Sequence, residues 1–191
     1  MNTRALCFAT VVAAVFVGDY SYADEVDAKA NAFAKHYADI CLRNLPDLEA
    51  LRARLIANNI PKFPPEQAGL FLRGSEGDIW PVPSQAHQGN FVMALRSGKN
   101  FCAIYGRRAS QNDVEKLFVQ LVGKAPPPFV SERMEDKTVE AGANRVRGHV
   151  ISYTWSMPNA KRKFLFMLST SDSEDADIQA LASASTIAEQ F

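Results

Sequence analysis

The chain has 191 residues, a length that suits one globular domain with its own hydrophobic core. Its 21 basic and 21 acidic side chains cancel, so the formal net charge is zero at pH 7. This balance argues against a nucleic-acid-binding protein, which concentrates positive charge for the phosphate backbone. It also argues against strong electrostatic binding to anionic lipid. Diffusing small molecules and proteins remain as partner classes.

The first 23 residues have the organisation of a secretory signal peptide. A basic start at Arg4 precedes the apolar run 5–17 and the small-residue site 21–23, the order that signal peptidase requires. The run is shorter than the roughly 20 residues that span a bilayer, and the alternative is a buried N-terminal helix. Cys7 starts the run rather than following it, so no lipid is expected. We predict a signal peptide at 1–23 and an exported, periplasmic domain at 24–191 without an integral membrane segment.

Two cysteines, Cys41 and Cys102, remain after cleavage. An even number of cysteines in an exported protein favours a disulfide, and the alternative is two separate buried thiols. Closing a loop of about 60 residues stabilises a fold by at most roughly 4 kcal/mol in the chain-entropy description. We predict the bridge, which would tie the first helix to a later strand.

The region after the signal is predicted to be helical and then to change to strands. Apolar residues recur every three or four positions over 24–43, which predicts a helix: they are Val26, Ala30, Phe33, Tyr37 and Ile40. Further helices are predicted from Pro46 to about residue 59 and over 66–72. The period then becomes two, with a strand at 78–82, which prolines confine to a sheet edge, and a hairpin of strands at 90–96 and 100–107.

The second half is predicted to repeat an order of strands and helix. Ser110 is the predicted N-cap of a helix that ends near Gly123. Strands follow at about 129–139, 145–157 and 162–171. The acidic run 172–177 is interpreted as the start of a last helix at 175–189, with a stripe of Ile178, Leu181, Ser185 and Ala188. The sequence therefore predicts an α+β domain, in which N-terminal helices precede two β-β-β-α units that form an antiparallel sheet with helices packed on one face.

The sequence contains no recognised motif of catalysis, metal binding or cofactor binding. The three histidines, His36, His87 and His149, lie on different predicted elements and lack zinc-ligand spacing. No nucleophilic serine motif is present, and the acidic run 172–177 lacks the glycine and the terminal glutamate of a calcium loop. We therefore predict no catalytic, cofactor-binding or metal-binding residue. Carboxylates that pair only in space remain an open alternative.

Basic residues form the one candidate binding surface. Arg107 and Arg108 end a predicted strand, and Lys161, Arg162 and Lys163 adjoin the turn at Pro158. Most such clusters are solvated surface, whereas some bind an acidic partner. We keep these five residues as a candidate partner-binding surface. Trp80 and Trp155 are interpreted as packing residues rather than a ligand platform.

Four segments carry a resemblance to known sequences: "ICLRNLPDLEALRARL", "PPEQAGLFLRGSEGDIWPVP", "FCAIYGRRASQNDVEKLF" and "ISYTWSMPNAKRKFLFMLST". On these segments the chain resembles a family of small exported proteins and lipoproteins of Gram-negative bacteria that have no known function. The resemblance implies a protein of the cell envelope and no particular activity. The chain departs from the lipoprotein members because it lacks their lipidation cysteine.

Two functional hypotheses follow from these observations. The first is a non-enzymatic periplasmic domain that binds another envelope protein or a small component of the envelope. An inhibitor or an immunity protein is one version of this hypothesis. The alternative is a periplasmic hydrolase that uses carboxylates or a histidine assembled by the fold. A deep cleft with two convergent carboxylates or a histidine–carboxylate pair would favour the hydrolase, and a shallow surface would favour binding.

Overall fold

The computed structural model describes residues 27–85, 90–141, 146–173 and 175–188. The predicted signal peptide at 1–23 lies outside the described residues. The elements in chain order are α1 (Ala28–His36), the π-helical turn η1 (Tyr37–Leu42), the 3-10 turn η2 (Leu45–Asp47), α2 (Leu48–Ala57), α3 (Pro65–Leu72), β1 (Gly77–Val82), β2 (Phe91–Arg96), β3 (Phe101–Gly106), α4 (Gln111–Val122), β4 (Val130–Ala141), β5 (Val146–Ser156), β6 (Arg162–Ser171) and β7 (Ala180–Ala188).

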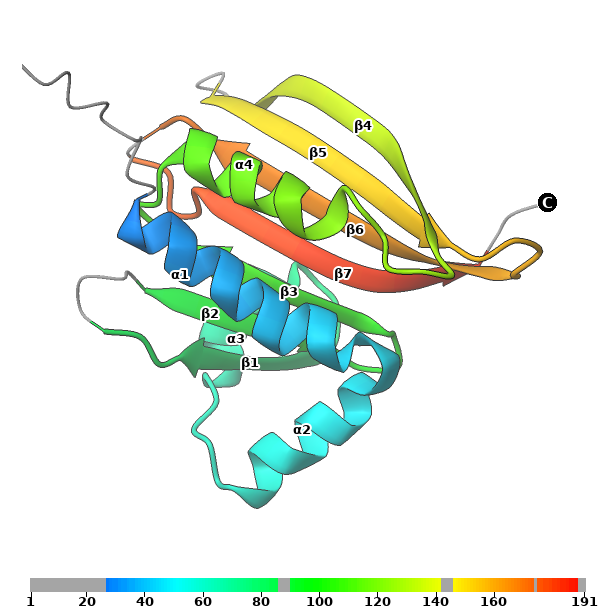
Figure 1. Cartoon of the computed structure of the whole chain (residues 1–191). Helices are drawn as coiled ribbons and strands as arrows, with labels where there is room; N and C mark the ends of the chain where they lie inside the picture. Colours follow the sequence, from blue (N-terminus) through cyan, green and yellow to red (C-terminus); the bar gives the residue numbers. More distant parts are fainter. Residues whose placement is uncertain (1–26, 86–89, 142–145, 174, 189–191) are drawn as a thin grey trace, which may run out of the picture.

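The strands form one seven-stranded sheet in the order β1-β2-β3-β7-β6-β5-β4. All six pairings are antiparallel. The sheet therefore consists of two three-stranded meanders, β1–β3 and β4–β6, which β7 joins in the middle (Figure 1). The prediction of an α+β fold with an antiparallel sheet after N-terminal helices is confirmed.

The predicted last helix at 175–189 is wrong, because this segment contains strand β7. Alanine occupies every second position from 180 to 184, which is the period of a strand. Ala180, Ala182 and Ala184 are at most 1 % exposed and belong to the main core. Alanine is the best helix former, so the local preference is helical, and the pairing with β3 and β6 overrides it. The second predicted β-β-β-α unit is therefore a four-stranded segment without a helix.

The helices lie on both faces of the sheet, which corrects the prediction that they share one. Figure 1 shows α1 and α4 side by side on one face, where their apolar sides cover the main core. Helix α3 packs on the opposite face of β1–β3, with Ala68 and Leu72 against a smaller cluster that includes Ile79 and Tyr105. The first meander is thus covered on both faces.

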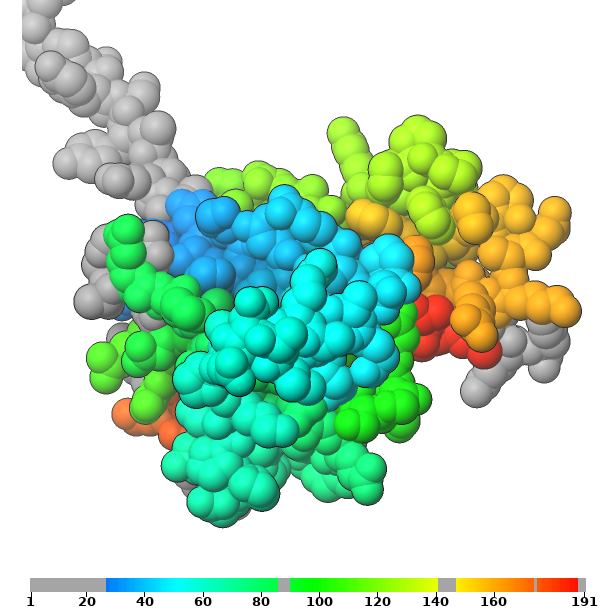
Figure 2. Space-filling model, turned by 90° about the horizontal axis from the view of Figure 1, so that it is seen from below, coloured from blue at the N-terminus to red at the C-terminus, as the bar shows by residue number. Residues whose placement is uncertain are grey.

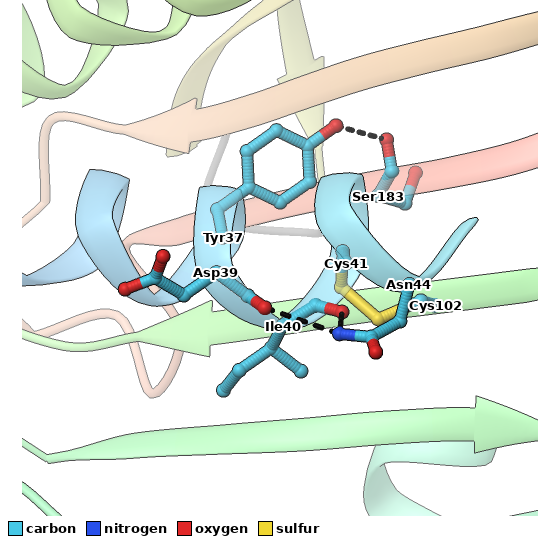
Figure 3. The surroundings of a disulfide bond; sticks show 7 residues. All are labelled: Tyr37, Asp39, Ile40, Cys41, Asn44, Cys102 and Ser183. Atoms are coloured by element: carbon cyan, nitrogen blue, oxygen red, sulfur yellow. Dashed lines mark hydrogen bonds between the residues drawn. A yellow bond between two sulfur atoms is a disulfide. The ribbon is translucent and has the colours of Figure 1, made fainter. Parts of the chain in front are cut away.

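A disulfide between Cys41 and Cys102 fixes the end of the first helical segment to β3 (Figure 3), as predicted. The two Cα atoms are 5.4 Å apart, and both residues are fully buried. In the π-helical turn that carries Cys41, the side-chain amide of Asn44 donates hydrogen bonds to the carbonyl oxygens of Asp39, at 3.1 Å, and Ile40, at 2.9 Å. The Tyr37 hydroxyl donates to the Ser183 carbonyl of β7 at 2.9 Å. The turn is therefore held to both β3 and β7.

The two edge strands carry features that oppose pairing with another sheet. Strand β4 has charged residues along its length and a bulge between Arg133 and Glu135. In β1, Pro81 lacks a backbone donor, and the Ile79 carbonyl accepts a hydrogen bond from the Phe63 amide at 2.8 Å. Within the described residues, none of the helices has the length and the apolar character needed to cross a membrane.

Candidate functional site

The structure separates the five predicted basic residues into two groups. In the register of the sheet, Phe101 of β3 pairs with Ser185 and Gly106 pairs with Ala180, while Arg162 of β6 pairs with Ala188. Lys161, Arg162 and Lys163 therefore lie at the end of the sheet where β3 begins. Arg107 and Arg108 follow the other end of β3, about 20 Å away for a six-residue strand. The five residues do not form one surface.

Two adjoining hollows surround the end of β7, and both involve Arg162. The first hollow, about 560 Å³ in volume, is lined by Phe129, Met157, Phe164 and the residues 161–163, among others. The second hollow, about 520 Å³, is lined by Lys99, Phe101, Ser185 and Ile187, among others. Asn100, Arg162 and Thr186 line both. Figure 2 shows the end of β7, in red, at the surface between the green β2–β3 turn and the orange β5–β6 turn.

Asn100 holds the elements around these hollows in place. Its side-chain amide donates to the Leu45 carbonyl at 2.9 Å and to Thr186 Oγ1 at 2.5 Å. Its carbonyl accepts from the Thr186 amide at 3.0 Å. The end of β7 is thereby fixed to the β2–β3 turn and to η2. In the floor of the first hollow, the rings of Phe129 and Phe164 pack with centroids 5.6 Å apart. We call the two hollows together the basic end of the sheet.

The basic end gathers positively charged side chains around two hollows. Many other basic side chains form ion pairs, as Lys35, Arg43, Arg52, Lys62, Arg133 and Lys137 do. Among the described residues, no ion pair engages Lys99, Lys161 or Arg162. Their lack of ion pairs is shared by other described basic residues, Arg107 and Arg108 among them. No described Asp or Glu lines either hollow. The positive charge of Lys161 and Arg162 is therefore left without an acidic neighbour in either hollow, within the part of the chain that the structure describes.

A further hollow lies on the other side of Asn100 and has the opposite chemistry. It has a volume of about 510 Å³, and Asp47, Glu49 and Asp78 line it together with Arg52 and with Lys99, which also lines the second hollow. Burial by itself would raise the pKa of Asp78, but the hydrogen bond from Lys62 and the charges of Arg52 and Lys62 lower it. Glu49 pairs with Arg52, and Asp78 pairs with Arg52 and Lys62. Asp47 accepts a hydrogen bond from the Ala50 amide at the start of α2. These carboxylates mark the limit of the basic end.

The sheet also assembles a histidine cluster that no local motif indicates. His149 on β5 pairs through Nδ1 with Glu115 of α4, at 2.9 Å, and through Nε2 with Asp136 of β4, at 2.8 Å. Glu115 also accepts from Thr170 Oγ1 at 2.6 Å and from Gln111 Nε2 at 2.8 Å. The hydrogen bond to Glu115 is the main cause that raises the pKa of His149. Both ring nitrogens donate in the imidazolium form, which leaves no lone pair free to accept a proton.

The other histidines and tryptophans considered from the sequence pack against the core or bind the backbone, so far as the structure describes them. His36 packs against Phe91, with ring centroids 5.1 Å apart, and burial lowers its pKa. Trp80 is 1 % exposed in the core, and Trp155 donates to the Val122 carbonyl at 2.7 Å. His87 lies outside the described residues. No group of three or more metal-ligating side chains occurs among the residues that the structure describes.

The acidic run 172–177 does not start a helix, so the helix-dipole interpretation of these charges is wrong. It belongs to the connection between β6 and β7. Gln179, which follows the run, donates from its side chain to the Ser173 carbonyl at 2.9 Å. The residues that sequence reasoning missed are those that surround the predicted lysines, namely Lys99, Asn100, Phe129, Phe164 and Thr186. They come from separate segments, and no spacing in the sequence connects them.

Comparison with known proteins identifies no relative. No family model matches the chain, and neither a curated protein nor a solved structure matches it.

Proposed function

We propose that this protein is an exported, non-enzymatic domain that binds an acidic partner in the cell envelope through the basic end of its sheet. One observation carries the proposal: Lys99, Lys161 and Arg162 gather without ion pairs around two hollows that no described acidic residue lines. A protein with no net charge has no general attraction for acidic molecules. A local excess of one sign therefore supports recognition by complementary charge.

Export of the chain belongs to the same proposal. The predicted signal peptide at 1–23 supports it, and so does a fully buried disulfide, since such bonds persist in oxidising compartments. The resemblance to exported proteins of Gram-negative bacteria supports a periplasmic location and another envelope protein as the partner. An inhibitor or an immunity protein would act through a surface of this kind.

The geometry of the histidine cluster favours binding over the hydrolase alternative. A general base needs a free lone pair close to the proton that it removes, and both ring nitrogens of His149 already contact carboxylates. Its charge is compensated by Glu115 and Asp136, which are themselves tied to α4 and β4. Such a cluster joins elements of the fold, and the hydrolase receives no specific support from it.

A capture experiment with matched charge reversals tests the proposal. The mature domain, the variant Lys161→Glu/Arg162→Glu and the control Arg107→Glu/Arg108→Glu are each immobilised and exposed to periplasmic extract. Both variants change the net charge equally, but the control alters the opposite end of β3. We expect a partner that the domain and the control retain and that the first variant loses at least tenfold.

Equal retention by all three proteins would contradict the assignment of binding to the basic end. Loss by the control alone would place the binding surface at the other end of the sheet. Failure to recover any partner with the unaltered domain, at native abundance and low salt, would count against a protein-binding function. N-terminal sequencing of the protein from the periplasm should start at Asp24, and a native chain that retains Met1 would contradict export by cleavage.

A further inference from the structure

We propose that the basic end binds an acidic polypeptide segment that carries one bulky apolar side chain beside its carboxylates. This inference rests on the proposed function and specifies the chemistry of the partner. The apolar side chain enters the first hollow. The neighbouring carboxylates contact Lys161 at the first hollow, Lys99 at the second hollow, and Arg162, which lines both.

The first hollow offers an apolar floor that is open to solvent. Phe129 and Phe164 are partly exposed there although their rings pack together, and Met157 is 42 % exposed. Phe164 is also anchored in the sheet, because its ring contacts that of Phe166 with centroids 6.5 Å apart. This apolar surface is held in place by the core and is exposed to solvent. Its burial by a partner therefore lowers the free energy of the complex. The hollow, at about 560 Å³, can accept an aromatic side chain.

The basic side chains next to this apolar floor determine which charged groups the ligand carries beside its apolar group. Lys161 and Arg162 line the first hollow, and Arg162 also lines the second, where Lys99 lies. None of these three side chains has an ion-pair partner among the described residues. An arginine presents a planar fork that fits a carboxylate. A ligand that spans both hollows therefore combines an apolar group with carboxylates on at least one side of it.

A polypeptide fits this arrangement better than an anionic acyl chain. An acyl chain requires a continuous apolar channel, whereas Asn100, Arg162 and Thr186 interrupt the apolar surface between the two hollows. Successive side chains of a polypeptide alternate in chemistry over similar distances, about 3.4 Å per residue in an extended segment. The polar boundary between the hollows can then face the backbone of the segment.

The test uses short peptides and the isotope-labelled mature domain with its disulfide intact. The probe is a blocked pentapeptide of four glutamates around a central phenylalanine, and its matched control carries alanine at the centre. Binding is measured by NMR titration, which detects weak affinities and locates them on the chain. We expect shifts at the amides of Asn100, Phe164 and Thr186, and about tenfold tighter binding of the phenylalanine peptide.

Variants separate the apolar contribution from the charge. Phe129→Ala and Met157→Ala should each reduce the preference for phenylalanine several-fold and leave the alanine peptide unaffected. Met134→Ala, at an exposed methionine on β4, is the matched control and should change neither affinity. Lys161→Glu/Arg162→Glu should weaken both peptides at least tenfold. Two independent substitutions at the floor keep the test valid if one of them disturbs the fold, which the amide spectrum reveals.

The outcomes distinguish this inference from the proposed function. Equal affinities for the two peptides, with shifts at the basic end, would overturn the apolar pocket and leave recognition of acidic partners intact. Shifts around Arg107 and Arg108, or no binding of either peptide at millimolar concentration, would overturn both. Tighter binding of decanoate than of the phenylalanine peptide at the same amides would identify an amphiphile site and overturn the polypeptide assignment.

Discussion

His149 links three elements of the fold through charged hydrogen bonds. Its ring lies between Glu115 of α4 and Asp136 of β4. Arg133 pairs with the same Asp136 and donates to the Tyr153 hydroxyl at 2.8 Å. Strand β4 has no other side-chain link to α4 of comparable strength among the described contacts. The protonated histidine therefore holds the outermost strand of the sheet to the helix above it.

The first prediction concerns the pH dependence of this contribution. The folded-state pKa of His149 is raised, chiefly by the hydrogen bond to Glu115. A raised pKa means that the stabilisation is fully present below the unfolded value of about 6.5 and is lost as pH rises through the folded value. We expect His149→Gln to lower the free energy of unfolding by on the order of 1 kcal/mol at pH 5.5. The difference from the unaltered protein should shrink by pH 9, as measured by urea denaturation.

His36 provides an internal control with the opposite sign. Burial lowers its pKa, so protonation of the folded protein is unfavourable and stability is lost as pH falls below about 6.5. The free energy of unfolding of the His36→Gln variant should therefore increase, relative to that of the unaltered protein, as pH falls. If the effect of His149→Gln were constant between pH 5.5 and pH 9, the imidazolium would not be the species that holds β4.

This cluster shows which part of a site the sequence can predict. The cluster draws one residue from each of three elements, namely His149, Glu115 and Asp136. In its own segment, each of them belongs to no motif that indicates a site. Their meeting depends on the register of β4 with β5 and on the position of α4 over the sheet. The disulfide was predictable because only two cysteines follow the predicted signal peptide, so that their pairing required no knowledge of the register.

At the scale of elements, small residues let α1 approach the sheet closely. Beneath α1 and η1, β7 presents a row of alanines to the core, and β3 ends in Gly106. A Cβ atom added at Gly106 would lie 2.7 Å from the ring of Phe33, a residue that is 2 % exposed. The position of α1 therefore depends on the absence of a side chain at the end of β3.

The second prediction compares two Gly→Ala substitutions. Gly106→Ala should lower the free energy of unfolding by about 1–3 kcal/mol, because the buried Phe33 ring has to move. Gly69 lies inside α3, where an added Cβ would meet nothing within 4 Å. Gly69→Ala should stabilise by about 0.5–1 kcal/mol, because alanine has the higher helix propensity. Thermal unfolding measures both, and a neutral Gly106→Ala would show that α1 can shift without cost.

The sequence predicted most elements because their apolar periods are unambiguous. The predicted helices over 24–43 and from 46 to about 59 contain α1 and α2, and the one over 66–72 begins one residue after the start of α3. The predicted helix from Ser110 to near Gly123 matches α4. The first six strands also lie close to their predicted bounds. Strand β7 was missed because alanine and serine give a weak apolar contrast and alanine favours a helix. Its strand form results from its two neighbours, β3 and β6, which pair with it on both sides.

At the scale of the whole molecule, the last strand completes a sheet whose halves are otherwise separate. The meanders β1–β3 and β4–β6 consist of sequential hairpins, and each could form from local contacts. Among the described strands, β7 alone pairs with both meanders, with β3 through six residues and with β6 through nine. The β6–β7 pairing is local because the two strands follow one another in the chain, whereas the β3–β7 pairing joins distant residues such as Phe101 and Ser185. The β3–β7 pairing therefore carries the loop-closure cost of the fold.

The third prediction follows from this topology. A chain that begins at residue 24 and ends at residue 179 lacks β7. The backbone edges of β3 and β6 then lose their pairing partner, and the apolar side of α1 becomes exposed to solvent. We expect this chain to show no cooperative thermal unfolding and to lose its near-ultraviolet circular dichroism. A chain that ends at residue 188 keeps every described strand and is the matched control, which should unfold cooperatively. Cooperative unfolding of the shorter chain near the control's Tm would show that the two meanders, held by α1 and the Cys41–Cys102 bond, form a stable body without their central strand.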